Sequence, residues 1–295
     1  MDKNKSIDRM KELIEILNDA GKAYYQENRE LMSNFEYDRL YDELLELERE
    51  TGTILSLSPT QKVGYQVLSE LPKEAHETPM LSLDKTKDVE ALKDWLGDQK
   101  GLLSWKMDGL TIVLTYENGA LTKAVTRGNG EIGEVITGNA RVFANVPLSI
   151  PYKGQLVLRG EAVIRYSDFN RINQEIEDAQ ARYKNPRNLC SGSVRQLNSQ
   201  ITAQRSVRFL AFALVRAEGV DFSNSRKNQM EWLVSQGFET VEYREVTKDN
   251  LADAVNWFSQ TINSNDTPSD GLVLLFDDIA YGDSLGRTAK FPRNS

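Results

Sequence analysis

Two short segments rich in β-branched residues, 110–116 and 120–126, are joined by the dipeptide Asn118-Gly119. Asn-Gly readily adopts the positive φ angles of a type I′ turn, whose twist matches that of two adjacent antiparallel strands. The sequence therefore predicts a β-hairpin here. Further strands are predicted at 155–164, 208–215 and 271–276, and helices at 167–180, 226–236 and 250–262, with another helix that begins at Pro186. Hairpins interleaved with helices favour an α+β domain.

The first 65 residues have the pattern of two helices. Apolar residues at steps of three and four predict a first helix that buries one stripe and ends near Gly21. A second helix is predicted to begin at Ser33, which forms an S-x-x-E capping box with Glu36, and to end at Gly52. Residues 53–66 follow neither period. We therefore expect a helical subdomain at 1–65 and a larger domain at 66–295.

Composition limits the chemistry that the chain can perform. With one cysteine, Cys190, and one histidine, His76, it can form no intrachain disulfide and no zinc site of the usual Cys/His kind. Catalysis is therefore expected to rest on Lys, Arg, Asp, Glu or a borrowed metal ion. The sequence has no apolar run of roughly 18 residues and no signal-peptide pattern, so we expect a cytoplasmic protein without a membrane partner.

The net charge of −8 is unevenly distributed along the chain. Residues 1–65 carry 9 Lys+Arg against 14 Asp+Glu, whereas residues 66–295 carry 27 against 30. This balance provides no general positive surface for a phosphate backbone, but it leaves room for a local basic groove in the larger domain.

Lys106 is the first candidate for catalysis, in the sequence Lys106-Met107-Asp108-Gly109 between an apolar segment and the predicted hairpin. Apolar neighbours desolvate an amine, which lowers its pKa and makes the free amine available as a nucleophile. Asp108 could orient this amine or hold a metal ion. Because a K-x-D-G pattern is weak on its own, the residues also suit a solvated lysine before an ordinary Asp-Gly turn.

Other segments suit the binding of a phosphate or a sugar. Three glycines closely follow Arg127 and permit close approach of the main chain to a phosphate. Glu161 lies near the end of an apolar strand, where its carboxylate could accept hydrogen bonds from ribose hydroxyls. Phe212 could stack on a base or belong to the core. Arg187 and Arg195 could bind phosphate oxygens or lie on an ordinary helix surface.

Several motifs occur in a fixed order: YY at 24–25, EYD at 36–38, SPTQ at 58–61, HETPMLSLD at 76–84, KMDG at 106–109 and SDG at 269–271. Together they resemble the N-terminal half of the bacterial NAD-dependent DNA ligases over essentially the whole chain. Several motifs in order are more specific than any one of them. The resemblance implies a helical subdomain followed by a nucleotidyltransferase domain of antiparallel sheets flanked by helices, as in DNA ligases and mRNA capping enzymes.

The resemblance also implies a covalent reaction with NAD. Lys106 would attack the α-phosphate, form lysyl-AMP and release nicotinamide mononucleotide, the first step of sealing DNA nicks in replication and repair. Mg²⁺ would neutralise charge on the phosphate oxygens. Asp108 would support the lysine, Glu161 would hold the ribose and Phe212 would stack on adenine.

Further binding residues are carried over by the same resemblance. They are Ser82, Leu83, Ser104 and Arg127 near the nucleotide, Arg187 and Arg195 near phosphates or DNA, and Tyr24, Tyr25, Asn34, Tyr37 and Asp38 around the nicotinamide mononucleotide half.

The chain departs from the family pattern at five positions. The family usually has Glu at Ser104, His at Tyr25, and Asp at both Asn34 and Val135. It has Lys at Leu275, and loss of that cation is expected to weaken charge stabilisation by roughly a few kcal/mol.

The chain ends at Ser295, before the strand that would carry another catalytic lysine, so we expect an adenylation fragment truncated at its C-terminus. We expect a monomer whose partners are NAD and, mainly through domains outside this chain, nicked duplex DNA. The sequence does not identify metal ligands. Two alternatives stay open: a covalent nucleotidyltransferase that uses ATP, and a catalytically weakened relative that binds nucleotide or DNA without turnover.

Overall fold

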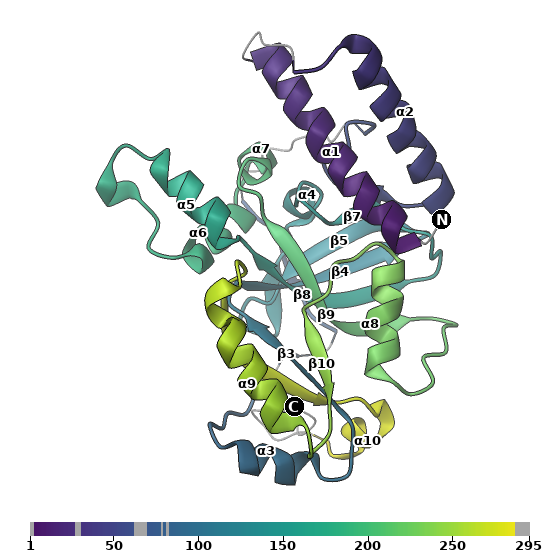
Figure 1. The fold of residues 1–295 in the computed structure, drawn as a ribbon, viewed down its shortest axis with the longest axis vertical. Coiled ribbons are helices and arrows are strands. Elements are labelled where there is room, and N and C mark those ends of the chain that lie inside the picture. The colour runs from purple at the N-terminus through teal and green to yellow at the C-terminus, as the bar shows by residue number, and fades with distance from the viewer. Residues whose placement is uncertain (1–2, 27–30, 62–69, 78, 81–82, 287–295) are drawn as a thin grey trace.

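The computed structural model describes residues 3–26, 31–61, 70–77, 79–80 and 83–286. A helical hairpin lies against a larger body that is built on two main antiparallel sheets and their helices (Figure 1). This arrangement confirms the predicted α+β fold, with its helices first and its sheets after them. None of the described helices combines the length and the apolar character that a membrane crossing requires.

The helical hairpin consists of α1 (Lys3–Gln26) and α2 (Asn34–Thr51). Ser33 caps α2 by accepting a hydrogen bond from the Glu36 amide at 3.2 Å, and Gly52 ends it with a φ of 64°, as predicted. The predicted end of α1 at Gly21 is wrong, because the helix continues to Gln26. One glycine lowers the stability of a helix by only about 1 kcal/mol, which the packing of the preceding apolar stripe offsets.

The two helices bury one shared apolar stripe and dock on the larger domain. The buried side chains of the helices are Ile7, Met10, Leu13, Ile14, Leu17, Leu40, Leu44 and Leu47, and Leu55, which follows α2, packs with them. Arg9 joins the helices, since its guanidinium donates to both carboxylate oxygens of Glu43 at 2.7 and 3.1 Å. Lys11 pairs with Glu239 of the larger domain at 3.2 Å.

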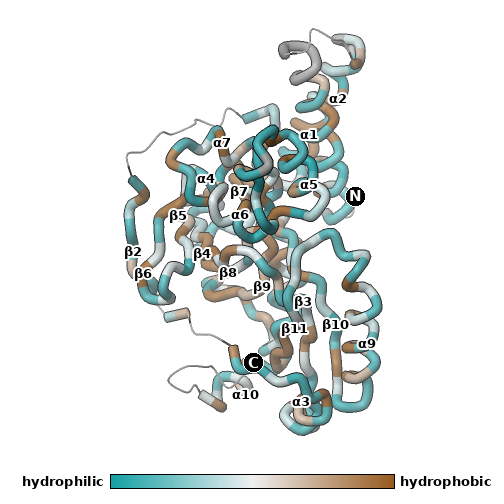
Figure 2. Tube along the Cα trace, turned by 90° about the vertical axis from the view of Figure 1, so that its left-hand side faces the viewer, coloured by the Kyte–Doolittle hydropathy of each residue, from teal (hydrophilic) through white to brown (hydrophobic). Residues whose placement is uncertain are grey.

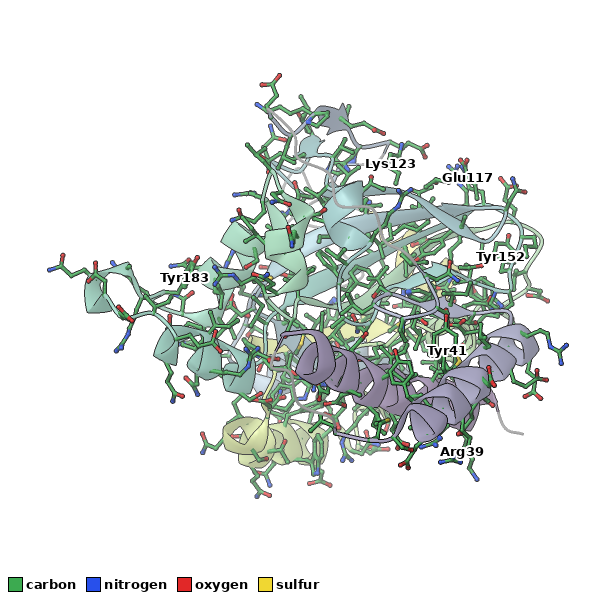
Figure 3. The ribbon with its side chains drawn as sticks, turned by 90° about the horizontal axis from the view of Figure 1, so that it is seen from above. Arg39, Tyr41, Glu117, Lys123, Tyr152 and Tyr183 are labelled. Carbon is green, nitrogen blue, oxygen red and sulfur yellow. The ribbon has the colours of Figure 1, made fainter. Side chains whose placement is uncertain are left out.

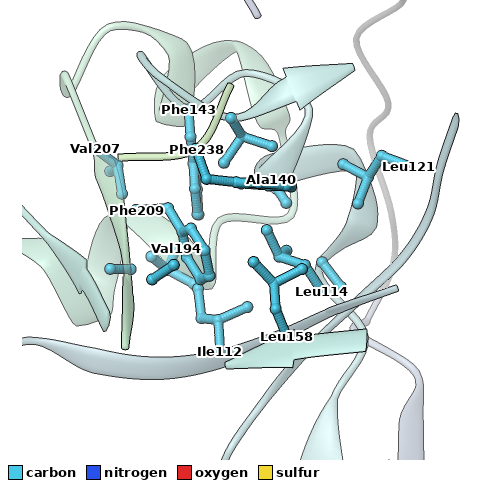
Figure 4. Close-up of a cluster of buried hydrophobic side chains, with 14 of the residues drawn as sticks. Ile112, Leu114, Leu121, Ala140, Phe143, Leu158, Val194, Val207, Phe209 and Phe238 are labelled. Carbon is cyan, nitrogen blue, oxygen red and sulfur yellow. The ribbon is translucent and has the colours of Figure 1, made fainter. Parts of the chain in front are cut away.

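The larger sheet has six antiparallel strands. Their spatial order is β1 (Ile54–Leu55), β7 (Pro147–Ser149), β5 (Ala120–Thr126), β4 (Leu110–Glu117), β8 (Leu156–Val163) and β9 (Arg208–Ala217). The predicted hairpin joins β4 to β5, and Asn118 and Gly119 have φ angles of 52° and 81°. The main core packs on one face of this sheet around Ile112, Leu114 and Phe209 (Figure 4).

The second sheet has three antiparallel strands, in the order β10 (Tyr243–Val246), β3 (Gly101–Met107) and β11 (Ser269–Phe276). The helices α3 (Val89–Leu96) and α9 (Leu251–Thr261) contribute to its separate core, where Trp105 packs edge-on against Phe258. Apolar segments of both sheets run through the interior of the molecule in Figure 2. A two-stranded ladder pairs β2 (Lys73–Ala75) with β6 (Ile132–Glu134).

The remaining helices are short. They are α4 (Thr137–Ala140), α5 (Tyr166–Gln174), η1 (Ala179–Ala181), α6 (Pro186–Val194), α7 (Ser199–Ala203), α8 (Arg226–Ser235), η2 (Ile262–Ser264) and α10 (Ile279–Ser284). The helix predicted at 167–180 begins within one residue of its predicted start, but its predicted end is wrong, because α5 ends at Gln174. Asp266 accepts hydrogen bonds from the Ser167 amide and hydroxyl at 2.9 and 2.6 Å, so the loop before β11 holds the start of α5.

Candidate active site

A row of side chains crosses the six-stranded sheet from β5 through β4 to β8. Thr111 and Glu161 are register partners, and the Thr111 hydroxyl donates to Glu161 Oε2 at 2.8 Å. Arg127 directly follows β5, and its amide donates to the Thr111 carbonyl at 2.9 Å. Opposed residues of antiparallel strands project to the same face. Arg127, Thr111 and Glu161 therefore share one face of the sheet.

The Glu161 carboxyl lies in a low-dielectric position, because only 9% of the residue is exposed. Burial raises the pKa of Glu161 to about 7. Hydrogen bonds from Thr111 and from the Gly109 main chain oppose this rise, as do the positive charges of Arg187 and Lys106. A buried carboxyl whose pKa lies near neutrality is typical of binding and catalytic sites.

Lys106 approaches this row from the other sheet, near the end of β3. Its Nζ lies 2.5 Å from Asp270 Oδ1, and 36% of the lysine side chain is exposed. Residue 271 on β11 is the register partner of Lys106, so the pairing of the two strands brings this aspartate to the amine. The amine therefore lies against a carboxylate, and not within the purely apolar walls that the sequence suggested.

Asp108 contacts an arginine, and the contact to the lysine comes from Asp270 instead. Arg187 on α6 donates to Asp108 Oδ1 at 3.0 Å. Gly109 follows and lets β4 approach β8 closely, since a Cβ there would lie 2.0 Å from the Ala162 carbonyl oxygen. The K-x-D-G motif thus brings an amine, an ion pair and a close strand contact to one end of the two sheets.

Phe212 lies on β9, where the register with β8 shifts, and it is half-buried against the main core. Sequence reasoning missed Arg159, which precedes Glu161 by two residues on β8 and shares its face. Burial lowers the pKa of Arg159, and the charge of Arg127 lowers it further. The period-two alternation of the strand would have identified this arginine beside the predicted carboxylate.

Ser104 and Leu275 lie on the same face of the three-stranded sheet as Lys106. Ser104 is buried opposite Val273, and Leu275 is half-buried opposite Leu102. The position expected to carry a phosphate-binding lysine therefore forms an apolar cross-strand pair.

The other predicted site residues of the larger domain are Arg195, Leu83 and Ser82. Arg195 follows α6, and its Nε pairs with Glu134 Oε2 at 2.8 Å. Leu83 is half-buried, whereas Ser82 lies outside the described residues. Val135, at the family's Asp position, is half-buried.

The predicted residues of the helical hairpin are placed by their helices. Tyr24 and Tyr25 lie in the last turn of α1, and Asn34 and Asp38 lie near the start of α2, but their side chains are outside the described part. The Tyr37 side chain is half-buried and stacks with Tyr41 at 6.3 Å between ring centroids.

Two carboxylates, Asp108 and Asp270, are the candidates to hold a metal ion at this centre. The described residues contain no group of three or more His, Cys, Asp and Glu side chains placed to hold a metal ion. Asp108 and Asp270 are each paired with a cation. Mg²⁺ at nucleotide sites is commonly held by one or two carboxylates together with phosphates and water, and these residues fit that mode.

A helical hairpin, an antiparallel two-sheet domain and a lysine paired with a carboxylate fit the nucleotidyltransferase class. Residues 68–295 match the NAD-dependent DNA ligase adenylation domain, and residues 3–64 match the DNA ligase-like, N-terminal NAD⁺-binding domain. The chain therefore belongs to the family of NAD-dependent DNA ligase adenylation domains.

Curated relatives agree with this family. The chain is 68% identical over 286 residues to a DNA ligase of Ruminiclostridium cellulolyticum and 64% identical over 286 residues to one of Lachnoclostridium phytofermentans. In each case the match covers 97% of this chain and 44% of the relative. The chain thus spans less than half the length of these relatives. Among solved structures, a mycobacterial DNA ligase D complexed with ATP and MES has 16% identity and a TM-score of 0.38, covering 68% of this chain and 54% of that one.

Proposed function

We propose that this adenylation domain transfers AMP from NAD to Lys106 as the first step of DNA nick sealing. The Lys106 nitrogen forms a bond to the α-phosphorus of NAD, and the pyrophosphate bond on the far side of that phosphorus breaks. Nicotinamide mononucleotide leaves with the electron pair of that bond, and the proton that the neutral amine loses as the new bond forms passes to water. The observation that carries the proposal is the Lys106 amine, which lies 2.5 Å from Asp270 and whose charge acts on the buried Glu161 carboxyl.

Each neighbouring residue has a chemical role in this step. Asp270 holds the amine in place, and the Asp108–Arg187 pair fixes the turn that follows it. Glu161 accepts hydrogen bonds from the ribose, while Phe212 stacks on adenine. Arg127 donates to phosphate oxygens, where a fixed guanidinium stabilises the charge of the transition state.

Mg²⁺ is proposed as a companion of the NAD phosphates. Asp270 pairs with Lys106, Asp108 follows the lysine by two residues and pairs with Arg187, and each carboxylate could contribute one ligand oxygen. The ion supplies positive charge for the phosphate oxygens when it is bound.

The helical hairpin, with a proposed boundary at residue 65, binds the nicotinamide mononucleotide half of NAD. Tyr24, Tyr25, Asn34, Tyr37 and Asp38 are the residues assigned to it by resemblance. The similarity of residues 3–64 to an NAD⁺-binding domain supports this assignment.

Nicked duplex DNA is the proposed acceptor of the AMP group, with most of its contacts made by domains outside this chain. Residues 165–208 support a local contact, since they carry eight Lys+Arg against four Asp+Glu in a chain of net charge −8. In Figure 1 the α5–α6 part of this segment projects from the body, and Tyr183 marks the projection in Figure 3. Arg187 and Arg195 would bind DNA phosphates there.

We further propose that the protein is a cytoplasmic monomer.

The proposal is tested by incubating the chain with NAD and Mg²⁺ and measuring its intact mass. We expect the mass to increase by one AMP group in the wild type and to stay unchanged in Lys106→Ala. No adduct in the wild type, or an equal adduct in the variant, would reject the proposal. ATP in place of NAD tests the other donor, and a larger yield with ATP would make this chain an ATP-dependent nucleotidyltransferase.

A second candidate is a relative that binds nucleotide without turnover. The apolar pair of Leu275 with Leu102 favours it, because a cation expected near the phosphates is missing. Saturable NAD binding by calorimetry with no adduct on Lys106 would support this candidate over the first.

A further inference from the structure

The single histidine of the chain contacts the main chain of a proposed phosphate-binding residue. His76 directly follows β2, and its Nε2 lies 3.1 Å from the carbonyl oxygen of Arg127. A carbonyl oxygen can only accept, so Nε2 carries the hydrogen of this bond. The His76 amide also donates to the Glu131 carbonyl at 2.8 Å. The histidine thus binds both ends of the short loop that follows β5.

A second contact holds the same arginine by its side chain. Arg127 Nη2 donates to the Met80 carbonyl at 3.1 Å, and the Met80 amide donates to the Gly130 carbonyl at 2.9 Å. Gly130 has a φ of 97°, and a Cβ there would lie 2.9 Å from the Met80 oxygen. His76 and Met80 therefore hold the main chain and the guanidinium of Arg127 from one neighbouring segment.

The contacts of the described residues connect this histidine to the site through other residues. The Arg127 amide bonds to Thr111, whose hydroxyl bonds to Glu161. A shift of the Arg127 main chain would therefore move one end of the side-chain row. Active-site groups need to be held within about 0.5 Å of their working positions, and neighbouring hydrogen bonds commonly do this.

We propose that His76 is a positioning residue for the adenylation step, and that its Nε2–H fixes Arg127 for contact with the phosphates of NAD. This inference rests on the proposed function of the site. In this proposal the histidine acts through Arg127, whose carbonyl oxygen it contacts. Its contribution is the geometry of the arginine, which the rate of AMP transfer reports.

Three substitutions separate the Nε2–H donor from the bulk of the ring. His76→Ala removes the donor, His76→Gln places an amide nitrogen near the Nε2 position, and His76→Asn places one near Nδ1. We expect His76→Ala and His76→Asn to lower the single-turnover rate of AMP transfer at saturating NAD by about tenfold. His76→Gln should stay within about twofold of the wild type, because it keeps the donor. Equal rates in all four proteins, or equal losses in the Gln and Asn variants, would overturn the proposal.

A double-mutant cycle tests whether His76 acts through Arg127. If it does, His76→Ala should have no further effect on the rate in an Arg127→Ala background, within about twofold. Losses that multiply would show that the histidine acts elsewhere. The same conclusion would follow if His76→Ala and His76→Gln shared a lower melting temperature that explained the defect of His76→Ala. The wild-type and Lys106→Ala masses are measured alongside. If the wild type forms no adduct, both the proposed function and this inference are rejected. If the wild type forms its adduct normally and the His76 variants are unaffected, only the inference is rejected.

Discussion

Glu161→Gln should change how the stability of the chain depends on pH. The Glu161 carboxyl is buried, and burial raises its pKa from 4.5 to about 7. Between these two values the folded chain keeps a proton on Glu161 that the unfolded chain has released. The free energy of unfolding therefore falls as the pH rises through this window and is lowest above it. At about 1.4 kcal/mol per unit, the full effect is at most about 3 kcal/mol.

Glutamine removes this titration and keeps an oxygen that can accept from Thr111, although its amide nitrogen needs a new acceptor. We expect the free energy of unfolding of Glu161→Gln relative to wild type to increase by about 1–3 kcal/mol between pH 5 and pH 8. The assay is urea unfolding of both proteins at each pH, with the exposed Glu117→Gln on β4 as the control. Other groups titrate in both proteins and cancel in the difference.

A difference that stays constant within about 0.5 kcal/mol across this range would refute the reasoning, because Glu161 would then not titrate near neutrality. The same variant should keep its fold and lose NAD affinity, since the amide replaces the proposed carboxylate acceptor of the ribose. Unchanged NAD affinity by calorimetry would contradict that role.

Three further substitutions test neighbouring residues. Gly109→Ala places a Cβ 2.0 Å from the Ala162 oxygen. We expect it to lower the free energy of unfolding, measured in urea, by roughly 3 kcal/mol or more. A loss under about 1 kcal/mol would show that the two strands can separate at little cost. Asp270→Asn removes the charge that holds Lys106, so the AMP-transfer rate should fall at least about tenfold with NAD affinity little changed, and an unchanged rate would contradict the role of this pair. Leu275→Lys restores a cation near the expected phosphate position and should raise the rate about tenfold or more; a slower enzyme would indicate that the pair with Leu102 matters more.

The parts of the fold that depend on neighbouring residues could be predicted from the sequence. The positive φ angles of Asn118 and Gly119 and the capping of α2 by Ser33 follow from the preferences of single side chains. The contact that holds the start of α5 could not be predicted, because Asp266 reaches Ser167 across 99 positions of sequence. Contacts of this kind depend on the tertiary structure and leave no local pattern.

The candidate site shows the same division. The K-x-D-G pattern indicates Lys106, and the apolar strand before it indicates Glu161. The sequence suggests Asp108 as the partner of the lysine, but the structure shows Asp270, 164 residues away. That contact results from the pairing of β3 with β11, which no short motif encodes. Arg159 was within reach of sequence reasoning, since it alternates with Glu161 on one strand.

The most direct test of the central claim is peptide mapping by tandem mass spectrometry after incubation with NAD and Mg²⁺. The account predicts one AMP group per chain, on the side chain of Lys106, in an amount that depends on NAD. An AMP group on a different lysine, or modification of Lys106 with ATP but not with NAD, would contradict it.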